Sequence, residues 1–231
     1  MPVYGYYVLV SIIAYLLGSL NFSLIISKIV FKQDIRNFGS GNAGATNSLR
    51  MMGKKWAAIV SLGDFAKGAG AVLIGQAIMY GLDQVDFNVG ENPMVWGQAL
   101  AGLFVIVGHM YPCFFGFRGG KGAWTTGGVI VVLDWRVALL CIAVFVTVIA
   151  ITRFVSLGSI LAAVAAPIFM WLLNPVRPSC DCGTHQNDAS YFIVVTAILC
   201  LLVIAKHYEN IGRLFKGTEK KLTLKKSKSE G

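Results

Sequence analysis

The sequence predicts an all-α integral membrane protein with seven transmembrane helices, an N-terminus outside and a C-terminus in the cytoplasm. Of its 231 residues, 56% are hydrophobic and only 13% are charged, and the mean hydropathy is +0.67. This composition is too apolar for an ordinary soluble domain of that length. Seven apolar runs follow one another along the chain. Because a backbone exposed to lipid must satisfy its own hydrogen bonds, we expect each run to be a helix.

The apolar runs differ in length. Their approximate bounds are residues 3–31, 56–80, 94–109, 122–133, 137–155, 157–173 and 190–206. A full crossing needs about 20 residues, so the third and fourth runs are short, and part of the stretch between them can dip to membrane depth. The first run is long enough to span the bilayer, and no basic segment precedes it. We therefore expect no cleavable signal peptide.

The basic residues predict the orientation, because lysine and arginine favour the cytoplasmic ends of membrane helices. All but two of the 20, Arg136 and Arg177, lie on one alternate set of connections or in the C-terminal segment. The opposite connections gather acidic residues. Fusing runs four and five would put the lysine-rich C-terminus outside, so the charges favour seven crossings over six. We expect one membrane domain, residues 1–215, and a disordered basic cytoplasmic tail, residues 216–231, near anionic lipid.

A polar stretch from Gly39 to Arg50 separates the first two runs. It reads Gly-Ser-Gly-Asn-Ala-Gly-Ala-Thr-Asn-Ser-Leu-Arg. Glycines let backbone N–H groups approach a ligand, hydroxyls and amides donate further hydrogen bonds, and Arg50 offers a planar fork for phosphate or carboxylate. We predict that this stretch holds an oxyanion.

The same stretch contains a misleading pattern. Its three glycines spell G-x-G-x-x-G, the fingerprint of dinucleotide-binding folds, and Asp64 follows about where a ribose-binding acid would lie. The context argues against a dinucleotide site. The preceding run is much longer than a strand, Asp64 lies inside another apolar run, and strands do not alternate with helices.

A second polar stretch lies between the third and fourth runs and includes Phe-Arg-Gly-Gly-Lys-Gly at 117–122. It fails the P-loop pattern G-x-x-x-x-G-K-[ST], because position 115 is Phe and position 122 is Gly. Its chemistry still suits a phosphate. The glycines around Lys121 expose backbone N–H groups beside a fixed ammonium.

A third polar cluster follows the last apolar run. If that helix continues, His207 and Asn210 share one face, while Glu209 and Arg213 form an i, i+4 pair on another. A histidine at a helix end is commonly a structural cap. Here it lies opposite two glycine-rich basic loops, so we take His207 as a functional candidate. Ser156, at the start of the sixth run, is a helix cap or a substrate contact.

Two further groups of polar residues have simpler interpretations. Asp64 and Lys67 lie three residues apart inside the second run, where ionisable groups are costly and usually paired, so we expect a mutual ion pair rather than substrate contact. Cys180, Cys182 and His185 match no standard zinc spacing, so we expect a loop with incidental thiols and no metal. The other three of the five cysteines read as small core residues.

The number of anion sites indicates a reaction class. Two glycine-rich basic loops converge with His207 and Arg213 on one face of the membrane in the predicted topology. Two phosphorylated substrates could be held together there. We therefore expect transfer between a phosphorylated polar molecule and a phosphorylated or activated lipid.

Several motifs follow one another through essentially the whole chain. They are Gly39–Asn47 with Arg50 and Gly53, Asp64 with Lys67 and Gly68, Gly108–Pro112, Phe117–Gly122, Ser156 with Leu157, and His207–Glu219. In content and order they resemble the PlsY-type bacterial acyl-phosphate:glycerol-3-phosphate acyltransferases. Two departures occur: Ala123-Trp124-Thr125 stand where the family usually has Val-Ala-Thr, and the loop at 174–188 is longer than expected. Neither touches the polar residues.

The resemblance implies a seven-helix fold and a specific reaction. A fatty acyl group passes from acyl phosphate to the 1-hydroxyl of sn-glycerol 3-phosphate, which gives lysophosphatidic acid and phosphate in the first acylation of phospholipid synthesis. It also implies the residues on which activity depends: Ser40, Arg50, Lys121, His207 and Asn210. The predicted substrate-binding residues are Gly39, Gly41, Asn42, Gly44, Thr46, Asn47, Gly119, Gly120, Gly122, Ser156 and Arg213.

An acyl phosphate is already activated, so we expect no covalent enzyme intermediate, no cofactor and no metal. The first loop, with Ser40 and Arg50, is assigned to the acyl-phosphate head, and Lys121 to both phosphates. Asn210 with Arg213 orients glycerol 3-phosphate. His207 is a general base on the 1-hydroxyl or an orienting hydrogen-bond donor to it, and the alternative is that a substrate phosphate oxygen takes the proton.

These assignments place the chain in the bacterial inner membrane with its active site facing the cytoplasm. The expected partners are the two substrates and membrane lipid, without nucleic acid, and the expected assembly is a monomer. Acyltransferases that use H-x-x-x-x-D are excluded, because the residue five places after each histidine is Phe114, Ser190 or Gly212. A transporter of a phosphorylated metabolite is the alternative. It predicts polar residues reaching the outer side, where the loops are acidic and have no glycine-rich partner.

Overall fold

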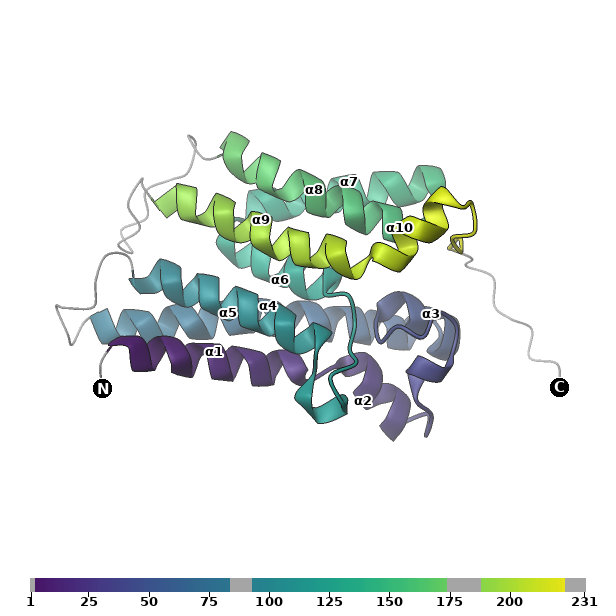
Figure 1. Cartoon of the computed structure of the whole chain (residues 1–231), viewed down its shortest axis with the longest axis horizontal. Helices are drawn as coiled ribbons and strands as arrows, with labels where there is room; N and C mark the ends of the chain where they lie inside the picture. The colour runs from purple at the N-terminus through teal and green to yellow at the C-terminus, as the bar shows by residue number, and fades with distance from the viewer. Residues whose placement is uncertain (1–2, 84–92, 174–187, 223–231) are drawn as a thin grey trace.

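Each apolar run of the sequence forms helix in the computed structural model, which describes residues 3–83, 93–173 and 188–222. No strand occurs within these three ranges. The long helices run side by side along the longest axis of the molecule (Figure 1): α1 (Val3–Ser19), α4 (Lys54–Asp83), α5 (Pro93–Met110), α6 (Ala123–Leu133), α7 (Trp135–Thr152), α8 (Val155–Leu173) and α9 (Asp188–Lys206).

Short elements gather at one end of this bundle, the right-hand end of Figure 1. They are α2 (Phe22–Ile29), the 3-10 turn η1 (Ile35–Asn37), α3 (Ala45–Met52), the 3-10 turn η2 (Cys113–Phe115) and α10 (Tyr208–Phe215). We call this the site end of the bundle.

Length and composition limit how many of these helices cross a bilayer. Four of the described helices, α4, α5, α7 and α8, are each long and apolar enough to cross a membrane. Two bent pairs, α1 with α2 (41°) and α9 with α10 (58°), are long and apolar enough only when each pair is taken as one span. Counting both pairs gives up to six spans. Helix α6 has 11 residues, or about 17 Å at about 1.5 Å per residue, against a hydrocarbon core of about 30 Å. An all-helical fold over the described residues, with four to six candidate membrane spans, is therefore confirmed, while seven full crossings stay a prediction.

The two bends come from local polar groups. Helix α1 ends at Ser19, and α2 begins after Asn21, whose side-chain oxygen accepts the Leu24 N–H at 3.1 Å. This is a standard N-terminal cap, which supplies one of the hydrogen bonds that a new helix lacks. The other bend lies at His207, the residue before α10. Both interruptions turn a short helix out of the bundle axis at the site end.

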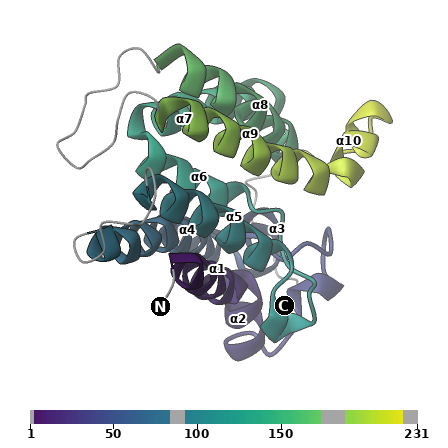
Figure 2. The ribbon, with the colours of Figure 1, turned by 60° about the vertical axis from the view of Figure 1, so that its left-hand side comes forward.

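Glycines bring the helices of the core into backbone contact. A Cβ on Gly68 of α4 would lie 2.2 Å from the Thr125 carbonyl oxygen of α6, and one on Gly128 would lie 2.0 Å from the Phe65 carbonyl oxygen. Small residues permit this close approach inside membranes, where burial of apolar surface drives little association. Figure 2 shows the result: α6 lies between α7, α8 and α9 on one side and α1, α4 and α5 on the other.

We expect Gly68→Ala to lower the thermal unfolding midpoint of the detergent-solubilised protein by several degrees. Its methyl group must displace the α6 backbone, and overpacking of this kind costs about 1–3 kcal/mol. Gly70→Ala is the matched control, because a Cβ there meets nothing within 4 Å and alanine favours helix by up to about 1 kcal/mol. Equal midpoints for the two variants would contradict the backbone contact.

Candidate active site

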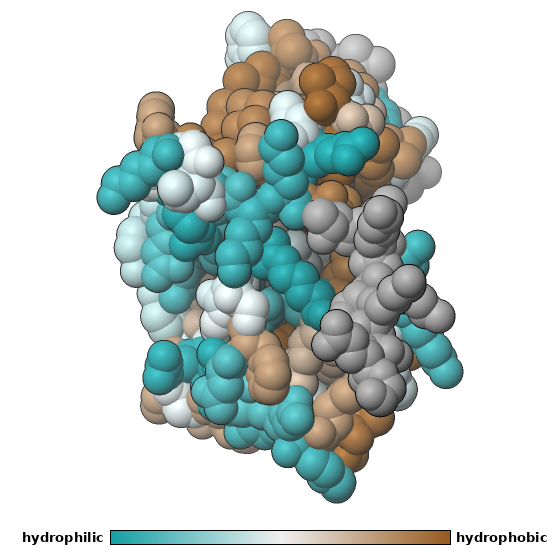
Figure 3. All heavy atoms as spheres, turned by 90° about the vertical axis from the view of Figure 1, so that its right-hand side faces the viewer, coloured by the Kyte–Doolittle hydropathy of each residue, from teal (hydrophilic) through white to brown (hydrophobic). Residues whose placement is uncertain are grey.

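A cavity of about 570 Å³ opens at the site end of the bundle. Polar side chains converge on it from the stretches 39–50, 117–122 and 207–219. Figure 3 shows hydrophilic residues gathered across this end of the molecule. Thirteen predicted site residues line the cavity: Gly39, Ser40, Asn42, Gly44, Thr46, Asn47, Arg50, Lys121, Gly122, Ser156, His207, Asn210 and Arg213. Three others, Gly41, Gly119 and Gly120, do not form part of its wall.

The first loop is held in shape from inside by Asn47. Its amide nitrogen donates to the carbonyl oxygens of Ile35 at 3.0 Å and Phe38 at 2.9 Å, and its amide oxygen accepts the Ser40 N–H at 3.1 Å. Gly39 adopts a φ of +59°, and a Cβ there would lie 2.2 Å from the Asn47 amide oxygen. The side chain that we predicted to bind substrate therefore braces the loop that presents Ser40.

The same loop leads into an anion-binding arrangement. Helix α3 begins at Ala45, and its first residues line the cavity, so the partial positive charge of a helix N-terminus faces the cavity. Arg50 lies on the same helix and is exposed. Within the described ranges, neither its guanidinium nor the Ser40 hydroxyl has a hydrogen-bond partner in the protein. Both groups are available to a ligand.

The second loop is anchored to α5 by the backbone N–H groups that we predicted to bind phosphate. The N–H of Gly119 donates to the Met110 carbonyl at 3.1 Å, and that of Gly120 donates to the His109 carbonyl at 3.1 Å. A Cβ on either glycine would collide with His109. These contacts correct the prediction that Gly119 and Gly120 bind substrate, because the two glycines let the backbone lie against α5. The same correction applies to Gly41, which turns the first loop at a φ of +70° and donates its N–H to the Phe38 carbonyl.

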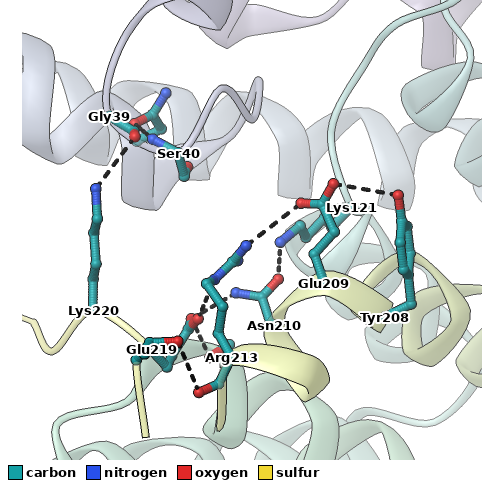
Figure 4. Close-up of polar contacts among 12 residues, drawn as sticks. Gly39, Ser40, Lys121, Tyr208, Glu209, Asn210, Arg213, Glu219 and Lys220 are labelled. Carbon is teal, nitrogen blue, oxygen red and sulfur yellow. Dashed lines mark hydrogen bonds and ion pairs between the residues drawn. The ribbon is translucent and has the colours of Figure 1, made fainter. Parts of the chain in front are cut away.

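Lys121, the next residue, joins the second loop to the His207–Glu219 motif. Its ammonium donates to the Asn210 amide oxygen (Figure 4). The Asn210 amide nitrogen in turn donates to Glu219 at 2.6 Å. The same carboxylate accepts hydrogen bonds from the Ser156 hydroxyl at 2.7 Å and from Arg213 Nε at 2.7 Å. Four predicted site residues are thus linked around Glu219.

Sequence reasoning missed Glu219 as a site residue. It belongs to the His207–Glu219 motif of the resemblance but lies in the segment that we assigned to a basic tail. In the structure the first part of that segment returns over the site: the Leu222 N–H donates to the Arg153 carbonyl at 2.7 Å, and Lys220 donates to the Gly39 carbonyl at 3.4 Å. Residues 216–222 therefore belong with the site, and the remaining tail lies outside the described residues.

The charged side chains at the site leave a net positive charge. Burial and the nearby Arg213 and Arg50 cations lower the pKa of Lys121 to about 8. Burial alone would raise the pKa of Glu219, but hydrogen bonds from Arg213, Ser156 and Asn210 hold it below its ordinary value. Glu219 is thus ionised at neutral pH and opposes only part of the cationic charge. A bound dianion would relieve the remaining repulsion.

His207 is positioned by its own helix. Its side chain is buried, and Nδ1 lies 2.7 Å from the Val203 carbonyl oxygen. A carbonyl oxygen can only accept a hydrogen bond, so Nδ1 carries a hydrogen, and the neutral ring presents a lone pair at Nε2. His207 lines the cavity. A neutral His207 can therefore accept a hydrogen bond or a proton from a hydroxyl but cannot donate one through Nε2.

Below the polar groups the cavity wall becomes apolar. Its side chains come from α4, α6, α7, α8 and α9, and Trp124 packs edge-on against Phe145 with 6.3 Å between ring centroids. Cys141 and Cys200 are free thiols in this wall, as expected of small apolar residues. The predicted Cys180–Cys182 loop lies outside the described residues, and among those that are described no cluster of three metal-binding side chains occurs.

Comparisons with known proteins give a consistent result. A family model described as glycerol-3-phosphate acyltransferase matches residues 8–217. A glycerol-3-phosphate acyltransferase of Clostridioides difficile is 40% identical over 220 residues, which cover 95% of this chain and 97% of that protein. One of Thermoanaerobacter pseudethanolicus is 43% identical over 217 residues, which cover 94% and 96%.

Two solved structures share the fold. Both are crystal structures of PlsY, described as an integral membrane glycerol 3-phosphate acyltransferase. The glycerol 3-phosphate form is 34% identical with a TM-score of 0.77, and the lysophosphatidic acid form is 33% identical with a TM-score of 0.75. Each comparison covers 94% of this chain and 96% of the other.

We expect Glu219→Gln to lower the unfolding midpoint at pH 7 by several degrees, because Arg213 loses its buried counter-charge. The deficit should shrink as the pH falls below 4.5, the ordinary pKa of glutamate, since the wild-type carboxylate then takes up a proton too. Glu209→Gln is the control, because its pair with Arg213 is 3.6 Å long and half exposed and such pairs contribute little. A Glu219 variant as stable as the Glu209 variant would refute the role of this network.

Proposed function

Since the chain belongs to the glycerol-3-phosphate acyltransferase family and is an integral membrane enzyme of that activity, we propose that its acyl donor is an acyl phosphate. The acceptor is the 1-hydroxyl of sn-glycerol 3-phosphate, and the products are lysophosphatidic acid and phosphate. The PlsY structures support the acceptor and the product, because they are described as a glycerol 3-phosphate form and a lysophosphatidic acid form. The relatives named above are acyltransferases, which favours this reading over the transporter alternative.

The observation that carries the donor proposal is one cavity with two groups of anion-binding side chains. Ser40, Arg50 and the start of α3 form the first group, and Asn210 with Arg213 forms the second. Lys121 is bonded to Asn210 and lies close enough to both Arg213 and Arg50 for their charges to lower its pKa. Two dianions fit this arrangement better than one. The apolar wall beyond the polar groups gives the acyl chain a place beside its activated carbonyl.

The reaction then needs no covalent enzyme intermediate. The 1-hydroxyl oxygen attacks the acyl carbon, the bond between that carbon and the phosphate oxygen breaks, and phosphate leaves. The hydroxyl proton passes to His207 Nε2 or to a phosphate oxygen of a substrate. Cations fixed before the reaction stabilise the leaving phosphate and the tetrahedral oxyanion, which is the largest contribution that such a site makes.

In this proposal the site end of the bundle faces the cytoplasm of a bacterial cell, with the N-terminus outside and the C-terminus inside. The basic residues support that orientation, because Lys28, Lys54, Arg153 and Lys216 all lie at or beside the site end. Helix α6, too short to cross alone, begins at the cavity and counts as the partly embedded seventh helix. The working assembly is one chain.

The proposal is tested with the purified protein in lipid vesicles. We expect release of inorganic phosphate only when acyl phosphate and glycerol 3-phosphate are both present, with an equal amount of lysophosphatidic acid formed. Arg50→Gln should reduce this rate at least about 100-fold, because it removes transition-state stabilisation. Lys54→Gln, an exposed residue outside the cavity wall, is the matched control. Turnover with acyl-coenzyme A and none with acyl phosphate would overturn the donor assignment.

The depressed pKa of Lys121 predicts a pH profile. The ammonium is needed to bind phosphate, so kcat/KM should fall as the pH rises through about 8, where the free enzyme loses this proton. Lys121→Arg should move the falling limb to higher pH, because a guanidinium stays protonated, even if its maximal rate is lower. Identical alkaline limbs in the two enzymes would show that Lys121 does not control the profile.

A further inference from the structure

A buried charged network lies beneath the second loop; two of its members, Asp64 and His109, also line the cavity, but none of them has a role in the reaction described above. The Lys67 ammonium on α4 lies 2.9 Å from the Asp64 carboxylate and 3.0 Å from His109 Nδ1. It also donates to the carbonyl oxygens of Gly18 at 3.0 Å and Leu20 at 2.9 Å, where α1 ends. The three ionisable side chains are 2–4% exposed. The ion pair predicted from the sequence is therefore confirmed, with a histidine as its third member.

The hydrogen bonds fix how the histidine ring is held. A lysine ammonium only donates, so His109 Nδ1 accepts, and the hydrogen of the neutral ring lies on Nε2. Asp64 Oδ1 lies 3.5 Å from the same nitrogen; both atoms are acceptors, so the Lys67 ammonium is the donor that binds both and fixes this edge of the ring. The opposite edge is directed toward the second loop. Burial of a charged pair inside a membrane helix is costly and is usually connected with function.

The free edge of the ring lies against the backbone that presents Lys121. A Cβ on Gly120 would lie 2.2 Å from His109 Nε2 and 2.5 Å from the Ala43 carbonyl oxygen. The Gly120 backbone thus passes between the ring and the first loop. Ala43 is itself held by the Asn21 amide, which donates to its carbonyl at 3.3 Å. The network therefore supports the point where the two anion-binding loops meet.

We propose that Asp64, Lys67 and His109 are positioning residues for the reaction. They hold the imidazole as a fixed spacer between α4 and Gly120, which sets the distance between the Lys121 ammonium and the first loop. The inference rests on the proposed function, because it assigns Lys121 to phosphate. None of the three residues contacts a reacting atom in it. Their effect is geometric, and a displacement of about 1 Å in such a site can cost about 100-fold in rate.

The principal test is His109→Asn in the full-length protein. The shorter side chain still offers Lys67 an acceptor but lacks the ring edge that meets Gly120. We expect kcat/KM for glycerol 3-phosphate to fall at least tenfold while the unfolding midpoint stays within a few degrees of wild type. His109→Gln, whose longer side chain reaches toward Gly120, should recover part of the loss. Wild-type kinetics in His109→Asn would overturn the inference.

A charge-neutral pair of substitutions separates positioning from stability. Asp64→Asn or Lys67→Met alone leaves one buried charge unpaired, so each should lower the unfolding midpoint. The double variant removes both charges; we expect its midpoint to recover while kcat/KM stays at least tenfold low. The control is Gln98→Leu, which breaks another buried polar contact between α4 and α5, the 2.9 Å bond to Gln76, and should leave kinetics unchanged. Full recovery of activity in the double variant would show a structural role only.

The inference and the proposed function fail in different ways. If wild-type protein releases no phosphate from acyl phosphate, the proposed donor is wrong, and the same variants are then compared by calorimetric binding of glycerol 3-phosphate. A tenfold weaker affinity in His109→Asn supports the positioning role even then. An unchanged affinity overturns it.

Discussion

The hydrogen bond between Lys121 and Asn210 is the contact on which the site depends. It joins residues 89 positions apart and brings the loop between α5 and α6 against the helix that follows α9. Glu219 strengthens this junction, because it accepts hydrogen bonds from Asn210, Arg213 and Ser156 at once. A single carboxylate thus orders the cations without neutralising them all. What remains is a preorganised positive pocket at the edge of an apolar groove, which is what a phosphorylated lipid precursor requires.

The helix packing explains why this pocket can stay rigid inside a membrane. Glycines place α6 in backbone contact with α4, so the start of α6 and Lys121 just before it have little freedom to move. The buried group of Asp64, Lys67 and His109 supports the same loop from below. Close backbone contact and an internal charged network therefore act on one short segment.

Much of this arrangement could be predicted from the sequence, for identifiable reasons. The apolar runs predict the helices, and the basic residues at alternate ends of those runs predict that Lys121 and His207 lie on one face of the membrane. The three-residue spacing of Asp64 and Lys67 in an apolar run indicated their ion pair. What could not be predicted depends on tertiary contacts. Glu219 lies in a stretch whose composition reads as a solvated tail, and only the folded chain shows its three hydrogen-bond donors.

The hydrogen-bond partners of the backbone N–H and side-chain amide groups could not be predicted from the sequence either. A glycine-rich loop beside Lys121 suggests N–H groups free for phosphate, yet Gly119 and Gly120 donate to α5. Asn47 in an oxyanion-type motif suggests a ligand contact, yet its amide closes its own loop. In both cases the motif was recognised correctly, but composition cannot say which donors are already satisfied. The bend within the first apolar run was missed for a similar reason, since the Asn21 cap depends on one hydrogen bond.

The most direct test of the central claim is a structure of the protein with glycerol 3-phosphate and a non-hydrolysable phosphonate analogue of acyl phosphate bound together. The account predicts both phosphorus-bearing groups in the one cavity, with the Lys121 ammonium within hydrogen-bond distance of each and the acyl chain along the apolar wall. A phosphate group bound outside that cavity, or a Lys121 that contacts neither ligand, would contradict it.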